Sequence, residues 1–202
     1  MAINNVVFDI GNVMVVYNPH QVVEKLFPNH PDTNLLTQQI FKSQTWFDLN
    51  LGRLTEAEAN IQYNKLLSIE IAQLEQLMQE IKESLIPVEG SFELLTKLHQ
   101  ANVKLYSLTD NVREIMVYLR NRYTFWDYFS GVVVSAEVNA LKPAKEIYMH
   151  LLDSYNLSPQ NSVFIDDLPR NIEGAQAVGM QGIVFKDALS CELELKSLGV
   201  KF

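Results

Sequence analysis

Short apolar runs that end in polar residues recur along the chain, and they predict strands. The first run, Val6 to Phe8, is followed by Asp9 and then by Gly11. Similar runs cover residues 103–108, 132–134, 162–165 and 183–185. Runs of this kind, rich in β-branched residues, are typical of buried strands. From Gly90 onward, helical spacing and these runs alternate. The alternation predicts a parallel α/β sheet flanked by helices.

From Asn18-Pro19 to about Ser84 the pattern is helical, with no run of the strand type. Helices are expected at residues 21–27, around 35–40, from Thr55 onward and at 74–85. Thr55 is expected to be an N-cap, because Glu58 follows at the capping-box spacing. We therefore expect a core domain of residues 1–17 and 87–202. A small all-helical domain of residues 18–86 would be inserted after the first strand.

The composition is that of a globular protein, with 48% hydrophobic and 20% charged residues among 202. A net charge of −8 disfavours nucleic acid and anionic membranes as partners, because neutralising phosphates needs a basic face. The single cysteine, Cys191, excludes an intramolecular disulfide. No segment approaches membrane-spanning length, and the first residues do not resemble a signal peptide. We expect a cytoplasmic protein without a membrane partner. The sequence predicts no particular oligomeric state.

Three predicted strands end in polar residues that suit one task. These residues are Asp9, Thr109 and the adjacent pair Asp166 and Asp167, and Lys142 lies where the helix after the third strand is expected to begin. The carboxyl ends of parallel strands share the edge at which ligands bind. Two carboxylates are suitable ligands for Mg²⁺. A threonine hydroxyl can bond a phosphoryl oxygen, and a lysine can neutralise its charge.

Each of these features also has an ordinary explanation. A strand-ending Asp or Thr is usually a turn residue, and Lys142-Pro143 is common at a helix start, with Pro143 expected in the first turn. The Asp166–Asp167 pair is more specific, because adjacent carboxylates after a buried strand repel each other without a cation. The whole set in this order is more specific than any member.

With these motifs, the sequence resembles the haloacid dehalogenase-like (HAD) hydrolase superfamily over nearly the whole chain. The resemblance implies a Rossmann-like core, a helical cap at residues 18–86 and a small phosphorylated metabolite as substrate. Four segments carry it: Phe8–Val13; Leu108–Asp110; Lys142-Pro143 with Ile147-Tyr148; and Phe164–Asp167 with Asn171–Ala175 and Gly179.

The resemblance also implies roles for individual residues. Asp9 would be the nucleophile that forms an aspartyl-phosphate. Mg²⁺ would be held by Asp9, Asp166 and the backbone carbonyl of Gly11. Asp167 would either bind the ion or lie next to its ligands. The other expected site residues are Thr109 and Lys142 as catalytic groups, and Asp110, Asn111 and Lys142 as substrate-binding groups.

Two positions depart from the family pattern. Gly11 stands where family phosphatases usually carry an Asp as general acid and base, a role worth about 10²- to 10⁴-fold. Asp110 replaces the usual Asn after Thr109. The Asp-Ile-Gly-Asn-Val version at residues 9–13 resembles a subgroup that includes α-D-glucose-1-phosphate phosphatase. His20 and Asp110 are the first candidates for a substitute proton donor.

We therefore expect a Mg²⁺-dependent phosphatase of a small phosphomonoester, such as the sugar phosphate glucose 1-phosphate. One alternative is a C–halogen hydrolase, which needs no metal and typically lacks the Asp166–Asp167 pair. Another is a catalytically weak binding or regulatory protein of the same fold. Specificity is expected from the cap, where ordinary packing or solvent exposure is the alternative for each candidate. These candidates are Tyr17, His20, Trp46, Phe47 and Arg53.

Overall fold

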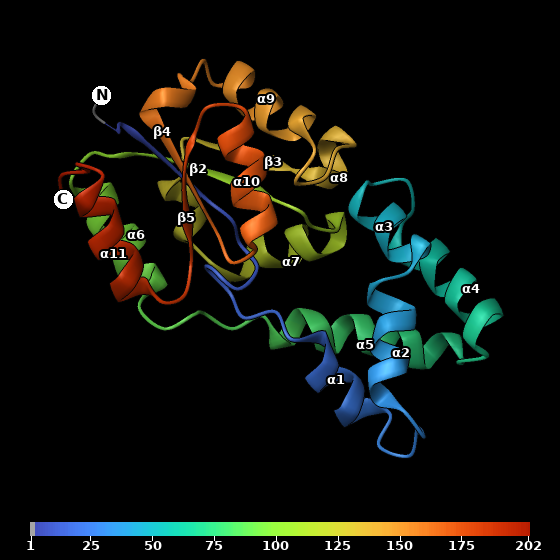
Figure 1. Cartoon of the computed structure of the whole chain (residues 1–202). Coiled ribbons are helices and arrows are strands. Elements are labelled where there is room, and N and C mark those ends of the chain that lie inside the picture. Colours follow the sequence, from blue (N-terminus) through green and yellow to red (C-terminus); the bar gives the residue numbers. More distant parts are fainter. Residues whose placement is uncertain (1–2) are drawn as a thin grey trace.

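The centre of the molecule is a five-stranded parallel sheet with strand order β3-β2-β1-β4-β5 (Figure 1). The computed structural model describes residues 3–202, so residues 1 and 2 of the expected core domain lie outside the described residues. The sheet confirms the predicted α/β class. Its strands are β1 (Asn5–Phe8), β2 (Lys104–Thr109), β3 (Gly131–Val134), β4 (Ser162–Asp166) and β5 (Gln181–Val184).

Register brings the strand-ending polar residues together. Phe8 on β1 pairs with Ser107 on β2 and with Ile165 on β4. The residues that follow these positions therefore emerge at the same edge, beside the centre of the sheet. Side chains alternate between the two faces: Val6 and Phe8 pack into one buried cluster and Val7 into another. Because both faces are buried, the strands have the continuous apolar runs that the sequence shows.

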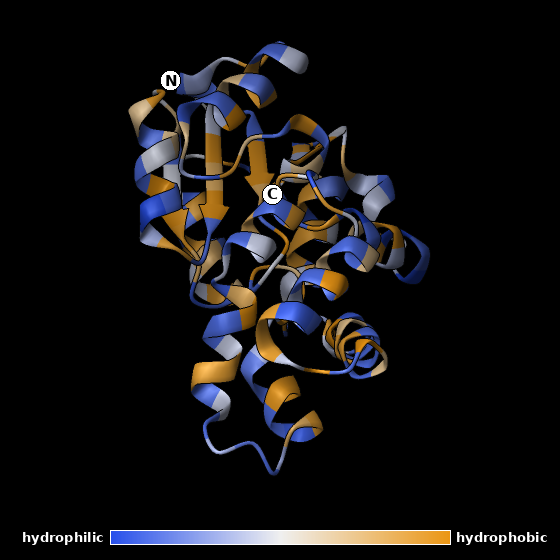
Figure 2. Ribbon diagram, turned by 90° about the vertical axis from the view of Figure 1, so that its right-hand side faces the viewer, coloured by the Kyte–Doolittle hydropathy of each residue, from blue (hydrophilic) through white to orange (hydrophobic). Residues whose placement is uncertain are grey.

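Helices cover both faces of the sheet. The strands are mostly hydrophobic, whereas the helices are striped, as expected for helices with one buried side (Figure 2). The larger buried cluster includes residues of α6 (Ser91–Gln100), α7 (Arg113–Arg122) and α11 (Ala188–Ser197). The cluster on the other face includes α9 (Lys145–Ser154) and α10 (Pro169–Ala177). The short helices are η1 (Phe125–Tyr128), α8 (Ser135–Val138) and η2 (Pro159–Asn161).

Five helices follow β1 and form a second lobe beside the sheet (Figure 1). We call residues 18–86 the cap, and the domain boundaries remain a proposal. Two chain segments join it to the core and run side by side: Val16 donates to the carbonyl of Ile86 at 2.8 Å, and Val88 to that of Met14 at 3.0 Å. The cap helices are α1 (Pro19–Leu26), α2 (Thr33–Phe41), α3 (Gln44–Asn50), α4 (Glu56–Leu67) and α5 (Ile71–Ser84).

Some of the local structure predicted from the sequence is confirmed, and some is missed or wrong. The capping box of α4 is confirmed, with both Thr55–Glu58 hydrogen bonds present. Helix α3 was not predicted, because seven residues are too few to show a periodic stripe. The predicted helix start at Lys142 is wrong. Lys142 and Pro143 lie in a turn closed by a 2.9 Å bond from Ala144 to Leu141, and α9 begins at Lys145.

Membrane crossing is a separate question of helix length and composition. Among residues 3–202, no helix combines the length and apolar character that crossing a bilayer requires.

Candidate active site

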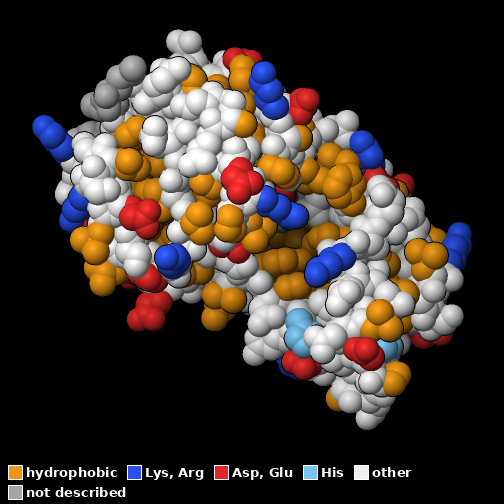
Figure 3. Space-filling view, in the orientation of Figure 1, with side chains coloured by type: hydrophobic (Ala, Val, Ile, Leu, Met, Phe, Trp, Pro, Cys, Tyr) orange, Lys and Arg blue, Asp and Glu red, His pale blue; other side chains and the backbone are white. Residues whose placement is uncertain are grey.

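A cavity of about 660 Å³ lies at the carboxyl edge of the sheet, between the core and the cap. Core residues Asp9, Asp110, Lys142 and Asp167 line one side of it. The space-filling view shows a hollow with hydrophobic side chains inside and basic side chains at its edge (Figure 3). The polar strand ends therefore face a space that can hold a small molecule.

Three charged side chains form a buried arrangement beside this cavity. The Lys142 ammonium lies 2.9 Å from Oδ1 of Asp9 and 2.7 Å from Oδ2 of Asp166. The Lys142 side chain is 1% exposed and that of Asp166 is 0% exposed. Asp9 also accepts the backbone N–H of Ile10 at Oδ1, at 2.7 Å. Both contacts of Asp9 go to the same oxygen, which leaves Oδ2 available for another partner.

Burial dominates the electrostatics of this arrangement. It raises the pKa of Asp9 to about 7, an effect that Lys142 opposes and the nearby Asp166 carboxylate reinforces. Burial would lower the pKa of Lys142, but Asp9, Asp166 and Asp110 together raise it. Lys142 therefore stays cationic, and a second cation would favour the ionised form of both carboxylates.

The acidic residues fit a divalent cation. Carboxylate oxygens of Asp9, Asp166 and Asp167 lie within 4.8 Å of one another. Asp166 is oriented by Asn171, whose amide donates to both carboxylate oxygens at 3.0 Å. Asp167 accepts a 3.2 Å bond from the side chain of Asn12. Oriented carboxylates of this kind are the hard ligands that Mg²⁺ prefers.

The strand end of β2 supplies the remaining polar groups. The buried hydroxyl of Thr109 has no hydrogen-bond partner among residues 3–202, and Thr109 itself does not line the cavity. Asp110 and Asn111 line the cavity. Oδ1 of Asp110 accepts the backbone N–H of Lys142 at 3.1 Å, and burial raises the pKa of this carboxyl. Asp110 therefore points toward the site and holds the Lys142 backbone in place.

Of the five cap-side candidates for specificity, the structure brings three to the cavity and two elsewhere. His20 lies 3.2 Å from both the Thr37 hydroxyl and the Glu24 carboxylate, and it does not line the cavity. Arg53 instead pairs with Asp48 at 3.2 Å. The residues that line the cavity are Tyr17, Trp46 and Phe47.

Two residues that hydrogen-bond the site carboxylates, Asn171 and Asn12, were not predicted as site residues. Asn171 belongs to a motif but was not expected to contact Asp166. The usable signal was its spacing, because a residue in the first turn of the helix after β4 points back to the strand end. The signal at Asn12 was its residue type, because asparagine adopts a positive φ more readily than most residues, and here its φ is 54° in the turn after Gly11.

Comparison with known proteins decides the family. A family model described as haloacid dehalogenase-like hydrolase matches residues 36–185. The chain belongs to this family. The match covers β2 to β5, most of the cap and the residues Lys142 and Asp166.

Relatives and structural neighbours of this haloacid dehalogenase-like hydrolase extend the comparison over more of the chain. Sesquiterpene phosphatase astK of Aspergillus oryzae is 28% identical over 195 residues, covering 95% of this chain and 94% of that protein. Flavin mononucleotide hydrolase 1 of Arabidopsis thaliana is 26% identical, covering 77% and 62%. A HAD family enzyme of Bacteroides thetaiotaomicron, solved with magnesium and inorganic phosphate, has a TM-score of 0.76. It is 20% identical, with 92% and 96% of the chains covered, and this likeness shows the shared fold.

Proposed function

We propose that this hydrolase is a Mg²⁺-dependent phosphatase that cleaves a phosphomonoester through an aspartyl-phosphate on Asp9. The observation that carries the proposal is the buried Asp9–Lys142–Asp166 arrangement beside the cavity. Two relatives are named as a phosphatase and as a hydrolase of a phosphorylated flavin, which supports the same chemistry. The structural neighbour was solved with magnesium and phosphate, which supports Mg²⁺ as cofactor.

In the proposed reaction the free Oδ2 of Asp9 attacks phosphorus, and the bond between phosphorus and the alcohol oxygen breaks. Lys142 and the Ile10 N–H hold Oδ1 and orient the carboxylate for this attack. The Thr109 hydroxyl donates to a phosphoryl oxygen. Water then attacks the phosphorus of the aspartyl-phosphate and releases inorganic phosphate and the Asp9 carboxylate. When bound, Mg²⁺ would neutralise charge on the phosphoryl oxygens.

The leaving group needs a proton or enough stability to depart without one. Gly11 has no group to supply a proton, and His20 does not line the cavity. Asp110 does line it, and its raised pKa keeps it as the candidate donor. Otherwise the site favours esters with good leaving groups, such as phenolic or anomeric phosphates. Glucose 1-phosphate, the substrate expected from the resemblance, stays a prediction.

The experiment is phosphate release from 4-nitrophenyl phosphate, with Mg²⁺ or with EDTA. We expect Mg²⁺-dependent turnover that Asp9→Asn lowers by at least about 10³-fold, because the amide is not nucleophilic. Asp153→Asn on the exposed side of α9 is the matched control and should retain wild-type activity. Activity of Asp9→Asn within about tenfold of wild type would refute the nucleophile. Metal-independent turnover of 2-chloropropionate, without phosphate release, would establish the dehalogenase alternative.

A further inference from the structure

We propose that the alcohol part of the substrate is an apolar or aromatic group that fills the cap side of the cavity, in place of a polyhydroxylated sugar. This inference rests on the proposed phosphatase function and names the substrate class of the same site. The apolar cap-side walls of the cavity, the hydrogen bonds that several of its amides already form, the charges at its edge and the contacts that fix α3 against the core carry it.

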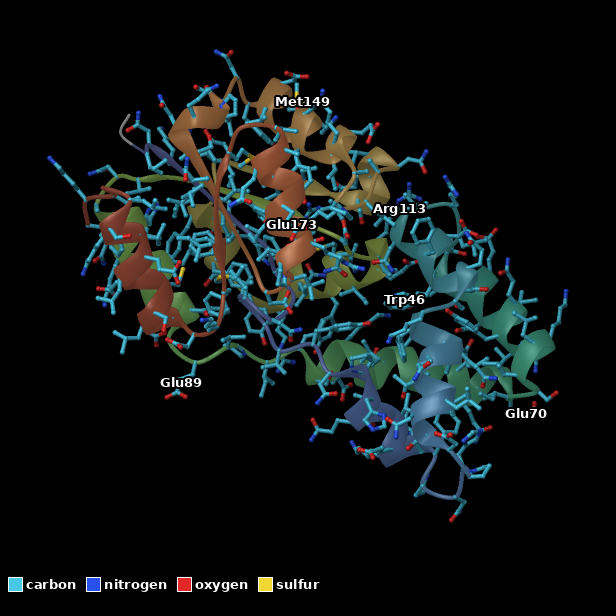
Figure 4. The ribbon with its side chains drawn as sticks, viewed as in Figure 1. Trp46, Glu70, Glu89, Arg113, Met149 and Glu173 are labelled. Carbon is cyan, nitrogen blue, oxygen red and sulfur yellow. The ribbon has the colours of Figure 1, made fainter. Side chains whose placement is uncertain are left out.

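The cavity changes character with distance from the charged cluster. Phe41 and Trp46 pack edge to face, with ring centroids 4.8 Å apart. Trp46 lies on the side of the cap that faces the core (Figure 4). Phe47 is 48% exposed at the cavity, so an apolar ligand there would remove its ring from water. The apolar wall comprises Phe41, Trp46, Phe47, Leu85, Ile115 and Leu141.

Several amide side chains along the same walls already form hydrogen bonds within the protein. The amide oxygen of Asn12 accepts the Tyr17 N–H, and its amide nitrogen donates to Asp167. Asn50 donates to the carbonyl of Trp46 at 2.9 Å, and Asn111 accepts the next backbone N–H at 2.9 Å. A sugar has several hydroxyls, and each one buried without a partner costs about tenfold or more in affinity.

Two buried side-chain atoms of the cavity lining have no hydrogen-bond partner among residues 3–202, the amide oxygen of Asn171 beside Asp166 and the hydroxyl of Tyr17. The Tyr17 hydroxyl can bond a single oxygen of the substrate or a water. A single hydroxyl can hydrogen-bond one isolated polar atom of an apolar alcohol, but it cannot satisfy the several hydroxyls of a polyol.

The edge of the cavity is charged, in contrast to its apolar wall. Lys42 and Arg170 line the cavity, both are exposed, and neither forms an ion pair within the described part of the chain. In a protein with a net charge of −8, two unpaired cations at one opening attract an anion to it. A phosphate ester of an apolar alcohol has this combination of an anionic end and an apolar body.

The aromatic wall is built against the core. The Ser135 hydroxyl donates to the carbonyl of Asn50, the last residue of α3, at 2.6 Å. Gly52 follows with a φ of +68°, and a Cβ there would lie 2.1 Å from the carbonyl oxygen of Ala136. Arg113, at the junction of α7 and α3 (Figure 4), donates to the same carbonyl at 2.9 Å. These contacts hold α3, and with it Trp46 and Phe47, over the charged cluster.

The test uses three phosphate esters whose phenols have nearly equal pKa values, so that the chemical step is matched. They are phenyl phosphate, 4-propylphenyl phosphate and 4-(2,3-dihydroxypropyl)phenyl phosphate. Full burial favours each added methylene by about fourfold. We therefore expect kcat/KM for the propyl ester to exceed that of phenyl phosphate by at least about tenfold. The dihydroxypropyl ester should be no better than phenyl phosphate.

Phe47→Ala should reduce the preference for the propyl over the dihydroxypropyl ester by at least about threefold, since it removes part of the wall. Leu66→Ala is the matched control, because Leu66 is 70% exposed on the cap and does not line the cavity. A dihydroxypropyl ester that is cleaved as well as the propyl ester would overturn the inference, and so would a preference that Phe47→Ala leaves unchanged. If no ester gives phosphate release that depends on Mg²⁺ and Asp9, the proposed function fails, and the inference with it.

Discussion

Replacing Lys142 with methionine removes the cation that bridges Asp9 and Asp166 while keeping the length of the side chain. Its ammonium lies 2.9 Å and 2.7 Å from the two carboxylates, and its side chain is 1% exposed. Removing one partner of a buried ion pair costs about 3–5 kcal/mol, because the other charge stays buried without compensation. For a chain of 202 residues, 1 kcal/mol corresponds to about 2–4 °C in Tm. We therefore expect Lys142→Met to lower Tm by about 10 °C in EDTA.

The fall in Tm caused by Lys142→Met should depend on pH. The pKa of Asp9 is raised in the folded protein from 3.8 to about 7, so its folded state binds a proton more tightly than the unfolded chain does. A group of this kind favours folding below the unfolded value, and the contribution is lost as the pH rises through the folded value. Lys142 lowers the pKa of Asp9, so its removal raises that pKa further. The deficit in Tm should therefore be larger at pH 8 than at pH 5.

The assay is thermal unfolding at both pH values, in EDTA and in excess Mg²⁺. Mg²⁺ should stabilise Lys142→Met more than the wild type, because it supplies the missing positive charge and binds the folded state. Lys145→Met, an exposed lysine at the start of α9, is the matched control and should melt like the wild type. A Lys142→Met protein that melts within about 2 °C of wild type at pH 8 in EDTA would refute the reasoning.

Three further predictions follow from single positions. Gly11→Asp should fold, because a Cβ there meets its nearest neighbour at an ordinary 3.8 Å, and it should raise kcat/KM for ethyl phosphate relative to phenyl phosphate by less than about 10²-fold. Gly52→Ala should lower the free energy of unfolding in urea by at least about 2 kcal/mol, and more than Gly199→Ala, whose Cβ would meet nothing within 4 Å. Lys82→Met should cost about 2–4 kcal/mol in the same assay, because it leaves Glu56, which is paired with Lys82 at 2.6 Å and 14% exposed, without its cation.

The sequence by itself determined the sheet and its functional edge. Apolar runs buried on both faces differ sharply from helical spacing, so strands and their order along the chain were readable. Asp9, Thr109 and Asp166 directly follow or end such runs, and parallel strands must place these residues at one edge. The capping box at Thr55 was readable for the same reason, since it depends on residues only three positions apart.

Only the tertiary structure decided what surrounds that edge. Hydrophobic spacing shows that a residue is buried and does not show which distant element covers it. His20 and Trp46 were equal candidates in the sequence, yet packing of α3 against the core brings Trp46 to the cavity, while His20 contacts Thr37. The contact of Lys142 with Asp9 also joins residues more than a hundred positions apart. Such contacts depend on how elements pack in space, which local periodicity does not encode.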